Sequence, residues 1–261
     1  MTRRPTFPAR IDFSQGQPAP ARKAGVMATE VPRRGAVERI PLGPQGLGMD
    51  SAAVRASMVQ KLAAQGVADP AVLRAMNAVE RHRFVEPALV NQAYEDTSLP
   101  IGLGQTISKP NVVARMIELL RHGVPGKMGR VLEIGTGCGY QAAVLCQLAT
   151  EVYSIERLRG LHDKARENLR PMRLANLHLL FGDGMAGFAQ GAPYAAIIAA
   201  AGGEAVPPAW LDQLAQGGRL VAPMVTATGQ QALVVIDKTS DGLKQTVLEA
   251  VHFVPLKSGI A

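Results

Sequence analysis

The sequence predicts an α/β fold with a doubly wound, mainly parallel sheet and an antiparallel hairpin at its C-terminal edge. From residue 130 onward, short apolar runs alternate with helical patterns, which is typical of parallel strands joined by helices. A glycine-rich turn at residues 135–139 follows the first run. The last three apolar runs have no helix between them, which predicts antiparallel pairing at that edge.

Residues 1–50 are expected to form a disordered extension. Seven prolines, interleaved with glycines and arginines, leave no helical or strand period. Eight basic residues against four acids give this segment +4 of the net charge of +7. We interpret it as a solubility tail. The remaining residues carry only +3, so a strongly basic face for nucleic acid is not indicated.

Residues 51–125 are predicted to be mainly helical. A first helix lies between Ser51, in position to cap it, and Gly66, in position to end it. A second helix is expected at residues 69–79, with Asp69 as N-cap and Pro70 in the first turn. A polar loop at 91–108 precedes a third helix, which begins near Pro110 and has apolar residues at helical spacing.

Residues 126–261 are predicted to form the α/β core. The expected strands are residues 130–135, 151–156, 177–183, 194–201, 218–224, 230–238 and 246–256. The expected helices are residues 142–149, 158–172 and 208–214. Each helix follows a strand, as a parallel sheet requires.

The composition excludes several other classes of protein. Aromatic residues make up only 4% of the chain, which argues against a stacking platform for single-stranded nucleic acid. Cys138 and Cys146 are not expected to pair, and no Cys/His group has zinc spacing. No apolar run has the length of a membrane span, and no secretory signal is recognisable. We expect a cytoplasmic protein with reduced thiols, without a metal and without a membrane partner.

The glycine-rich turn is a candidate cofactor site. Glu133, Gly135, Thr136 and Gly137 follow a strand and open a helix, where glycines allow a tight turn and a close approach to a ligand. The last glycine of a dinucleotide fingerprint is missing after residue 139, which disfavours an NAD-dependent dehydrogenase. The turn instead favours S-adenosyl-L-methionine, which has no pyrophosphate and whose ammonium group Glu133 would help to place, directly or through water.

Two further acids end the next two strands. Glu156 lies 21 positions after Gly135, where a carboxylate meets ribose hydroxyls in α/β folds. Asp183, followed by Gly184, is in position to accept a hydrogen bond from an adenine amino group. The alternatives are a surface salt bridge for Glu156 and a helix cap for Asp183. Three acids at consecutive strand ends beside one glycine turn predict a binding site.

These and other motifs resemble the protein-L-isoaspartate O-methyltransferase family over residues 52–258. The motifs are RFVEP, YEDTSLPIGLGQTISKPNVVARMIELL, VLEIGTGCGYQAAVL, VYSIERLRGL, GDG, GRLVAPM and VHFVPL. The resemblance implies a Rossmann-like, S-adenosylmethionine-dependent methyltransferase that methylates the α-carboxylate of L-isoaspartyl residues in damaged proteins and peptides. The ester re-closes to a succinimide, and hydrolysis then restores some normal aspartyl peptide. A monomer without a nucleic acid partner is expected.

The resemblance also implies roles for individual residues. The family's active-site serine corresponds to Ser108, with Thr106 and Ile107 beside it at the cofactor. The substrate-side strand corresponds to His252, Phe253, Val254 and Pro255. An extended peptide can pair with such a backbone, since main-chain hydrogen bonds tolerate many sequences. An ordinary buried strand would explain the same apolar residues.

A serine fits this chemistry. A carboxylate with a pKa of about 4 is already an anionic nucleophile, so methyl transfer needs alignment rather than a general base. The Ser108 hydroxyl can donate to one carboxylate oxygen without placing a fixed charge in the site. From the residues alone, Ser108 is also a candidate N-cap for the helix that begins at Pro110, and the two roles are compatible.

Two positions depart from the family pattern. Ala195 replaces an aspartate at the start of a strand, away from the cofactor edge, and a modest structural effect is expected. Gly202 and Gly203 are expected to loosen a loop at the rim of the site, with consequences for turnover or peptide preference. A methyltransferase acting on RNA or on a small molecule is the alternative, but it would not account for residues 105–108. A non-enzymatic protein that recruits a partner through its basic tail would not account for Ser108 and the acids.

Overall fold

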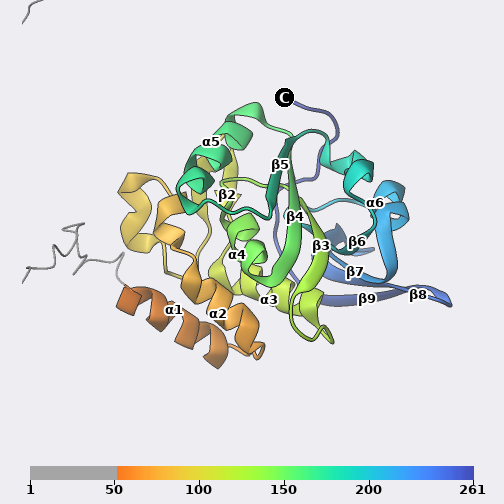
Figure 1. Ribbon diagram of the computed structural model, residues 1–261, viewed down its shortest axis with the longest axis horizontal. Coiled ribbons are helices and arrows are strands. Elements are labelled where there is room, and N and C mark those ends of the chain that lie inside the picture. Colours follow the sequence, from red (N-terminus) through yellow and green to blue (C-terminus); the bar gives the residue numbers. More distant parts are fainter. Residues whose placement is uncertain (1–51) are drawn as a thin grey trace, which may run out of the picture. The chain divides into compact units, whose positions relative to one another are not determined.

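The structure is a computed structural model that describes residues 52–261, so the predicted extension at 1–50 and the predicted cap Ser51 lie outside the described residues. A seven-stranded sheet with the order β5-β4-β3-β6-β7-β8-β9 forms the centre (Figure 1). The strands are β3 (Met128–Ile134), β4 (Ala149–Glu156), β5 (Leu177–Phe181), β6 (Tyr194–Ala199), β7 (Leu214–Val225), β8 (Gln231–Thr239) and β9 (Gly242–Ala250).

The first five of these strands pair in parallel, and β7–β8 and β8–β9 pair antiparallel. The predicted doubly wound sheet with an antiparallel C-terminal edge is therefore confirmed. The strand order reverses between β3 and β6, which creates a switch point at the carboxyl ends of these strands. Open α/β sheets bind ligands at such points.

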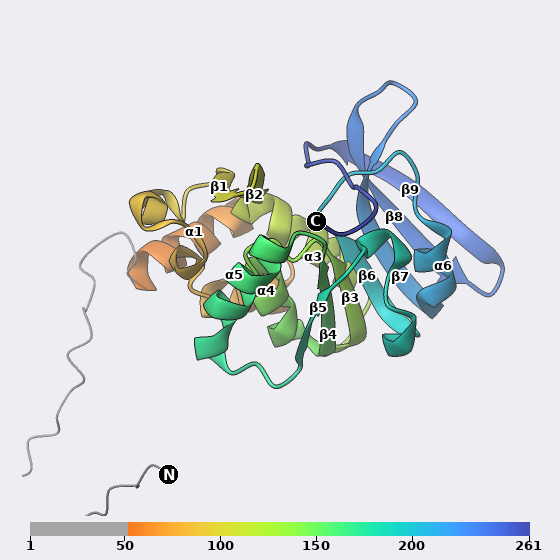
Figure 2. The same ribbon diagram turned by 90° about the horizontal axis from the view of Figure 1, so that it is seen from above.

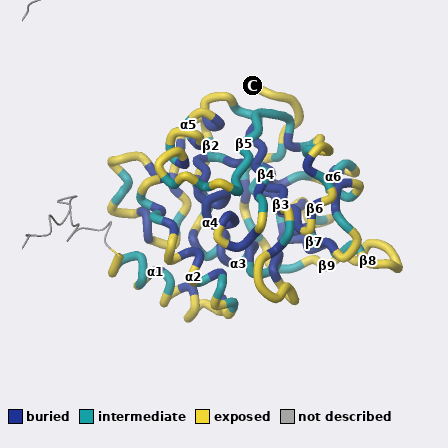
Figure 3. The backbone as a smooth tube through the Cα atoms, in the orientation of Figure 1, coloured by how far each residue is buried: buried dark blue, intermediate teal, exposed yellow. Residues whose placement is uncertain are grey.

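Helices cover both faces of the sheet, as the view from above shows (Figure 2). They are α1 (Ala52–Ala64), α2 (Pro70–Ala78), α3 (Pro110–Arg121), α4 (Tyr140–Leu148), α5 (Arg159–Leu169) and α6 (Pro208–Gln213). Neighbouring residues of β3 point to opposite faces of the sheet and pack in two different apolar clusters. Val131 packs in the cluster formed with helices α1–α5, and Leu132 packs in the cluster around Trp210 of α6. The buried segments consequently run through the middle of the fold (Figure 3).

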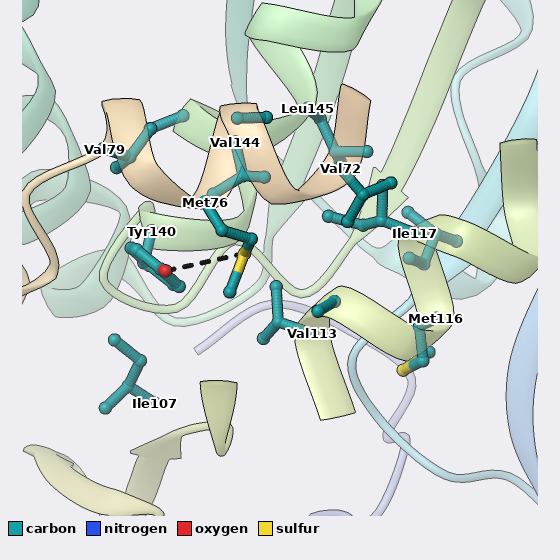
Figure 4. Packing of buried hydrophobic residues seen from close by; sticks show 14 of the residues in the cluster. Val72, Met76, Val79, Ile107, Val113, Met116, Ile117, Tyr140, Val144 and Leu145 are labelled. Atoms are coloured by element: carbon teal, nitrogen blue, oxygen red, sulfur yellow. Dashed lines mark hydrogen bonds between the residues drawn. The ribbon is translucent and has the colours of Figure 1, made fainter. Parts of the chain in front are cut away.

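The predicted helices agree with the structure. Asp69 caps α2 through a 2.7 Å hydrogen bond from the Ala71 N–H to its carboxylate, and Pro70 occupies the first turn. Gly66, with φ of +103°, follows the end of α1. Helices α2, α3 and α4 meet in a buried apolar cluster in which Val72, Val113 and Val144 take part (Figure 4).

The predicted polar loop at 91–108 is partly wrong, because it contains a two-stranded hairpin. Strands β1 (Leu99–Gly102) and β2 (Gln105–Ile107) pair antiparallel. Residues Gly102, Leu103 and Gly104 all have positive φ in the turn, which only glycine adopts without cost. These strands are too short, and too rich in glycine and proline, to show an alternating pattern in the sequence.

The last predicted strand, residues 246–256, is also wrong in its bounds. Strand β9 ends at Ala250, and the Val251 N–H makes one further bond to the end of β8, at the Gln231 carbonyl. Beyond it, the Gly202 N–H donates to the Val254 carbonyl at 2.8 Å, and the Leu256 N–H donates to the Gly202 carbonyl at 2.7 Å. One apolar run thus pairs with two different partners, which periodicity alone does not reveal.

Candidate active site

A pocket of about 480 Å³ opens at the carboxyl ends of β3, β4 and β6. It brings together segments that are far apart in the sequence: the β1–β2 hairpin, the glycine turn, the end of β4 and the C-terminal segment. Of the predicted site residues, those that line it are Thr106, Ile107, Ser108, Gly135, Thr136, Gly137, Glu156, Gly184, Val254 and Pro255. Glu133, Asp183, His252 and Phe253 do not line it.

The glycine turn is fixed by its neighbours. The N–H groups of Gly135 and Thr136 both donate to the Ile155 carbonyl, at 2.9 and 3.2 Å. Gly139 is the N-cap of α4 with φ of +93°, and a Cβ there would lie 2.5 Å from the Leu169 side chain. The turn therefore presents backbone, rather than side chains, to the pocket at the start of a helix.

Glu156 connects the glycine turn to β4. Its carboxylate accepts the N–H of Gly137 and that of Leu158, both at 2.9 Å. The residue is only 5% exposed and forms no ion pair within residues 52–261, so the alternative of a surface salt bridge is wrong. The carboxylate holds the turn in place and lines the pocket at the same time.

Glu133 lies beneath the pocket rather than in its wall. It is fully buried, and the Ser154 hydroxyl hydrogen-bonds both its carboxyl group and, at 2.6 Å, the Thr136 hydroxyl. Burial raises the pKa of Glu133 to about 8, against the lowering effect of Ser154 and Gln141. A chain of polar groups thus runs from the buried carboxyl to Thr136 in the pocket wall.

Asp183 caps a short turn and fastens the end of the chain. Its carboxylate accepts the Met185 N–H at 2.9 Å and the Gly259 N–H at 2.7 Å. The alternative of a capping aspartate is therefore confirmed, and the adenine contact stays a prediction. Gly184, which follows it, lines the pocket, and a Cβ there would lie 2.6 Å from the Ile134 side chain.

Ser108 follows β2 and faces the pocket. Within residues 52–261 its hydroxyl has no hydrogen-bonding partner, whereas its carbonyl accepts from Arg81 at 2.7 Å. The alternative role as a helix cap is wrong: the N-cap of α3 is Lys109, and the Asp96 carboxylate accepts the Asn111 N–H at 2.9 Å. The serine hydroxyl remains available to a ligand.

The C-terminal segment forms the opposite rim, and its backbone is already partly paired. The Gln231 side chain accepts the Phe253 N–H at 2.7 Å and donates to the Phe253 carbonyl at 3.2 Å. The Val254 carbonyl accepts the Gly202 N–H at 2.8 Å, and Val254 lines the pocket, whereas His252 is exposed. A peptide that pairs here can therefore use neither the Phe253 N–H nor the lone pairs of the Phe253 and Val254 carbonyls that are already bonded.

The expected loosening at Gly202 and Gly203 is wrong. Gly202 is bonded to the C-terminal segment, and Gly203 donates to the Pro223 carbonyl and accepts from the Val225 N–H. A Cβ on Gly202 would lie 2.4 Å from the Gln231 amide. The glycines allow close packing between β7 and the C-terminal segment rather than mobility. Ala195 lies at the exposed start of β6, away from the pocket, as expected.

Several lining residues were not predicted. The exposed Leu103 of the hairpin turn, Tyr140 and Gln141 at the start of α4, and Arg157 and Lys257 line the pocket. Tyr140 and Gln141 could have been inferred from their position directly after the glycine turn. Leu103 and Lys257 carried no signal, because their place depends on long-range folding.

Other features of the described residues bear on the chemistry. Residues 52–261 contain no group of three or more His, Cys, Asp or Glu side chains arranged to hold a metal ion. Cys138 and Cys146 are both buried and free. No helix in this part of the chain combines the length and apolar character needed to cross a bilayer.

Known proteins resemble this chain over most of its length. A family model described as protein-L-isoaspartate(D-aspartate) O-methyltransferase matches residues 53–261. Protein-L-isoaspartate O-methyltransferase of Methylibium petroleiphilum is 59% identical, covering 98% of this chain and 96% of its own. That of Leptothrix cholodnii is 60% identical, covering 93% and 84%.

Solved structures give the same result. A protein-L-isoaspartate O-methyltransferase has a TM-score of 0.71 at 27% identity, covering 79% of this chain and 67% of its own. A Plasmodium falciparum protein assigned the same activity, in complex with S-adenosyl-L-homocysteine, has a TM-score of 0.67 at 25% identity, covering 78% and 98%. Together with the family match over residues 53–261, these likenesses establish that the chain belongs to the protein-L-isoaspartate(D-aspartate) O-methyltransferase family.

Proposed function

We propose that this protein is an enzyme that transfers the methyl group of S-adenosyl-L-methionine to the α-carboxylate of L-isoaspartyl residues in damaged proteins and peptides. The resulting ester closes to a succinimide and so starts repair. One observation carries this proposal: a serine hydroxyl that has no hydrogen-bonding partner among residues 52–261 shares a pocket with a glycine turn and a strand-end carboxylate. The family membership supports the same activity.

The residues of the pocket fit S-adenosyl-L-methionine. The glycine turn leaves backbone at the wall, and the Glu156 carboxylate keeps lone pairs beyond its two backbone bonds, as two ribose hydroxyls require. We assign Thr106, Ile107, Ser108, Glu133, Gly135, Thr136, Gly137, Glu156, Asp183 and Gly184 to cofactor binding. Ser108 takes part on the cofactor side through its backbone, which leaves its hydroxyl for the acceptor. When bound, the cofactor supplies an electrophilic methyl group on a positively charged sulfur. Because Glu133 and Asp183 do not line the pocket, their contribution is indirect, through Thr136 and the C-terminal tail.

The acceptor side needs orientation more than activation. The isoaspartyl carboxylate is ionised at neutral pH, so no residue has to remove a proton. The Ser108 hydroxyl donates to one carboxylate oxygen and aims the other at the methyl group. Val254, with Phe253 and His252 on the same segment, guides the peptide backbone into the pocket from the rim. We further propose that the enzyme acts as a monomer in the cytoplasm, without a nucleic acid or membrane partner.

The test is methyl transfer from labelled S-adenosyl-L-methionine to two synthetic peptides that differ only in one L-isoaspartyl or L-aspartyl linkage. We expect label in the isoaspartyl peptide alone, and loss of that label as the succinimide forms. Equal labelling of both peptides, or cofactor binding without transfer to either, would reject the acceptor. Transfer to RNA or to a small molecule under the same conditions would support the alternative methyltransferase.

A further inference from the structure

Arg81 is a fully buried arginine whose hydrogen bonds converge on the acceptor side of the pocket. Its Nε donates to the Ala93 carbonyl at 2.8 Å. Its Nη2 donates to the Ser108 carbonyl at 2.7 Å and, more weakly, to the Thr97 carbonyl at 3.5 Å. A single guanidinium therefore ties the serine to the segment that precedes the hairpin.

The same guanidinium lies against the cofactor side. It stacks over the ring of Tyr140, 4.8 Å from the ring centroid. Tyr140 opens helix α4 directly after the glycine turn and lines the pocket. Its own position is secured by a hydrogen bond to the Met76 sulfur at 3.7 Å (Figure 4) and by the edge of Phe84. Arg81 thus stands between Ser108 and a firmly held residue of the cofactor turn.

This arrangement is costly for the fold. Within residues 52–261 Arg81 forms no ion pair with a carboxylate, and its buried Nη1 has no hydrogen-bonding partner. Burial lowers the pKa of Arg81 from its usual value, which reflects the same loss of hydration. A structural anchor would gain more from an apolar side chain of similar volume or from a paired charge. What the planar guanidinium group offers instead is a set of N–H donors in fixed directions.

We propose that Arg81 is a positioning residue for Ser108, which sets the distance between the serine hydroxyl and the cofactor turn by holding the Ser108 carbonyl against Tyr140. The inference rests on the proposed function, in which Ser108 orients the isoaspartyl carboxylate. Arg81 does not line the pocket, so we place it outside the groups that contact substrate or cofactor. It acts only through the backbone of Ser108.

The test compares Arg81→Lys with Arg121→Lys. Lysine keeps the positive charge and the aliphatic part of the side chain. Its single ammonium group cannot bond two separate carbonyls as the guanidinium group does. Arg121 is the matched control: it is 6% exposed, donates to Asp69 at 3.0 Å and to the Gly126 carbonyl at 2.7 Å, and does not line the pocket. We expect Arg81→Lys to lower kcat/KM for the isoaspartyl peptide roughly 10- to 100-fold, since small misplacements of a reacting group have effects of this size. We expect the Kd of S-adenosyl-L-homocysteine to change less than about twofold, and Arg121→Lys to affect only thermal stability.

A double-mutant cycle with Ser108→Ala distinguishes positioning of the serine from a purely structural role of Arg81 in the fold. If Arg81 acts through the serine, Arg81→Lys lowers kcat/KM by no more than about twofold in the Ser108→Ala background. The same loss in both backgrounds, or an equal loss in Arg121→Lys, would overturn the proposal. If the lysine variant does not fold, Arg81→Gln, which has a neutral side chain, replaces it, and we expect the same loss of kcat/KM in the wild-type background only. The wild-type assay is run beside them, so that failure of the proposed function, seen as no transfer by the wild type, is distinguished from failure of this inference.

Discussion

The cofactor half of the pocket and its acceptor half are held in shape by different kinds of interaction. In the cofactor half, residues 133–139 and Glu156, the turn follows parallel strand ladders and its N–H groups bond the neighbouring strand. In the acceptor half, residues 105–109 and 251–257, long side chains bond the backbone in addition to its pairing with Gly202: Arg81 holds Ser108, and Gln231 holds Phe253. Lys164 of α5 likewise donates to the Ile101 carbonyl of the hairpin at 2.9 Å.

The difference has a functional consequence. A cofactor of fixed shape is suited to a wall built from regular backbone, whereas a peptide acceptor of variable sequence needs a rim that can be adjusted residue by residue. Side-chain clamps allow the rim to change through single substitutions without disturbing the sheet. Substitutions in the two halves should therefore affect different kinetic constants.

Ser108→Ala is expected to have the largest effect on turnover. It removes a hydrogen bond to a charged carboxylate, which contributes about 1.5–3 kcal/mol, or roughly a 10- to 150-fold loss in kcat/KM for the isoaspartyl peptide. The Kd of S-adenosyl-L-homocysteine should stay unchanged. Ser108→Thr, which keeps the hydroxyl, serves as the control and should retain more activity than alanine. An alanine variant with wild-type kcat/KM would show that the Ser108 hydroxyl does not orient the acceptor.

Glu156→Gln is expected to weaken cofactor binding about tenfold, which a titration with S-adenosyl-L-homocysteine measures. An amide presents one acceptor oxygen in place of two, so the ribose competes with the N–H groups of Gly137 and Leu158. Glu151→Gln on the same strand is the matched control, because Glu151 pairs with Arg130 at the surface. Equal effects of the two substitutions would argue against a cofactor role for Glu156.

Gly202→Ala is expected to raise the KM for the peptide a few-fold at nearly constant kcat, on the order of 1 kcal/mol. The added Cβ would lie 2.4 Å from the Gln231 amide, which has to leave the Phe253 backbone to make room. Gln231→Ala should reproduce the change in KM, and the double variant should be no worse than either one. Additive losses would show that the clamp and the glycine act independently.

Glu133→Gln is expected to have the smallest effect on catalysis and a specific effect on stability. Because the folded-state pKa is raised to about 8 and the unfolded value is about 4.5, the folded protein holds a proton that the unfolded chain releases. Stability therefore falls as pH rises between these values, by at most about 1.4 kcal/mol per pH unit. The glutamine variant should lose this slope. Denaturant unfolding from pH 5 to 8 measures it, and parallel curves for both proteins would contradict a buried neutral carboxyl.

The contrast between the halves also explains what the sequence can predict. The parallel sheet, the turn at Gly135 and the carboxylate of Glu156 follow from local patterns, because strand ladders place successive strand ends at one edge. The β1–β2 hairpin, the end of β9 at Ala250 and the pairing at Gly202 do not. The strands of the hairpin are too short to show an alternating pattern. The other two features depend on contacts between residues far apart in the chain, such as Gln231 with Phe253, for which periodicity gives no signal.

The site residues also fall into those that the sequence predicts correctly and those that it does not. Ser108 and Val254 were expected in the site from the family motifs, and both line the pocket. Burial was not predictable: Glu133 lies under the wall, and Asp183 binds the C-terminal tail. The helix-capping role considered for Ser108 belongs to Asp96, fifteen positions before the Asn111 N–H that it accepts, a distance along the chain that capping rules do not cover.

The most direct test of this division measures two constants side by side for the wild type, Ser108→Ala and Glu156→Gln. The constants are the Kd of S-adenosyl-L-homocysteine and the kcat/KM for an isoaspartyl peptide at saturating cofactor. We predict a crossed result: Ser108→Ala loses kcat/KM and keeps the wild-type Kd, whereas Glu156→Gln loses affinity and keeps most of its kcat/KM. Proportional losses of both constants in both variants would contradict separate cofactor and acceptor halves.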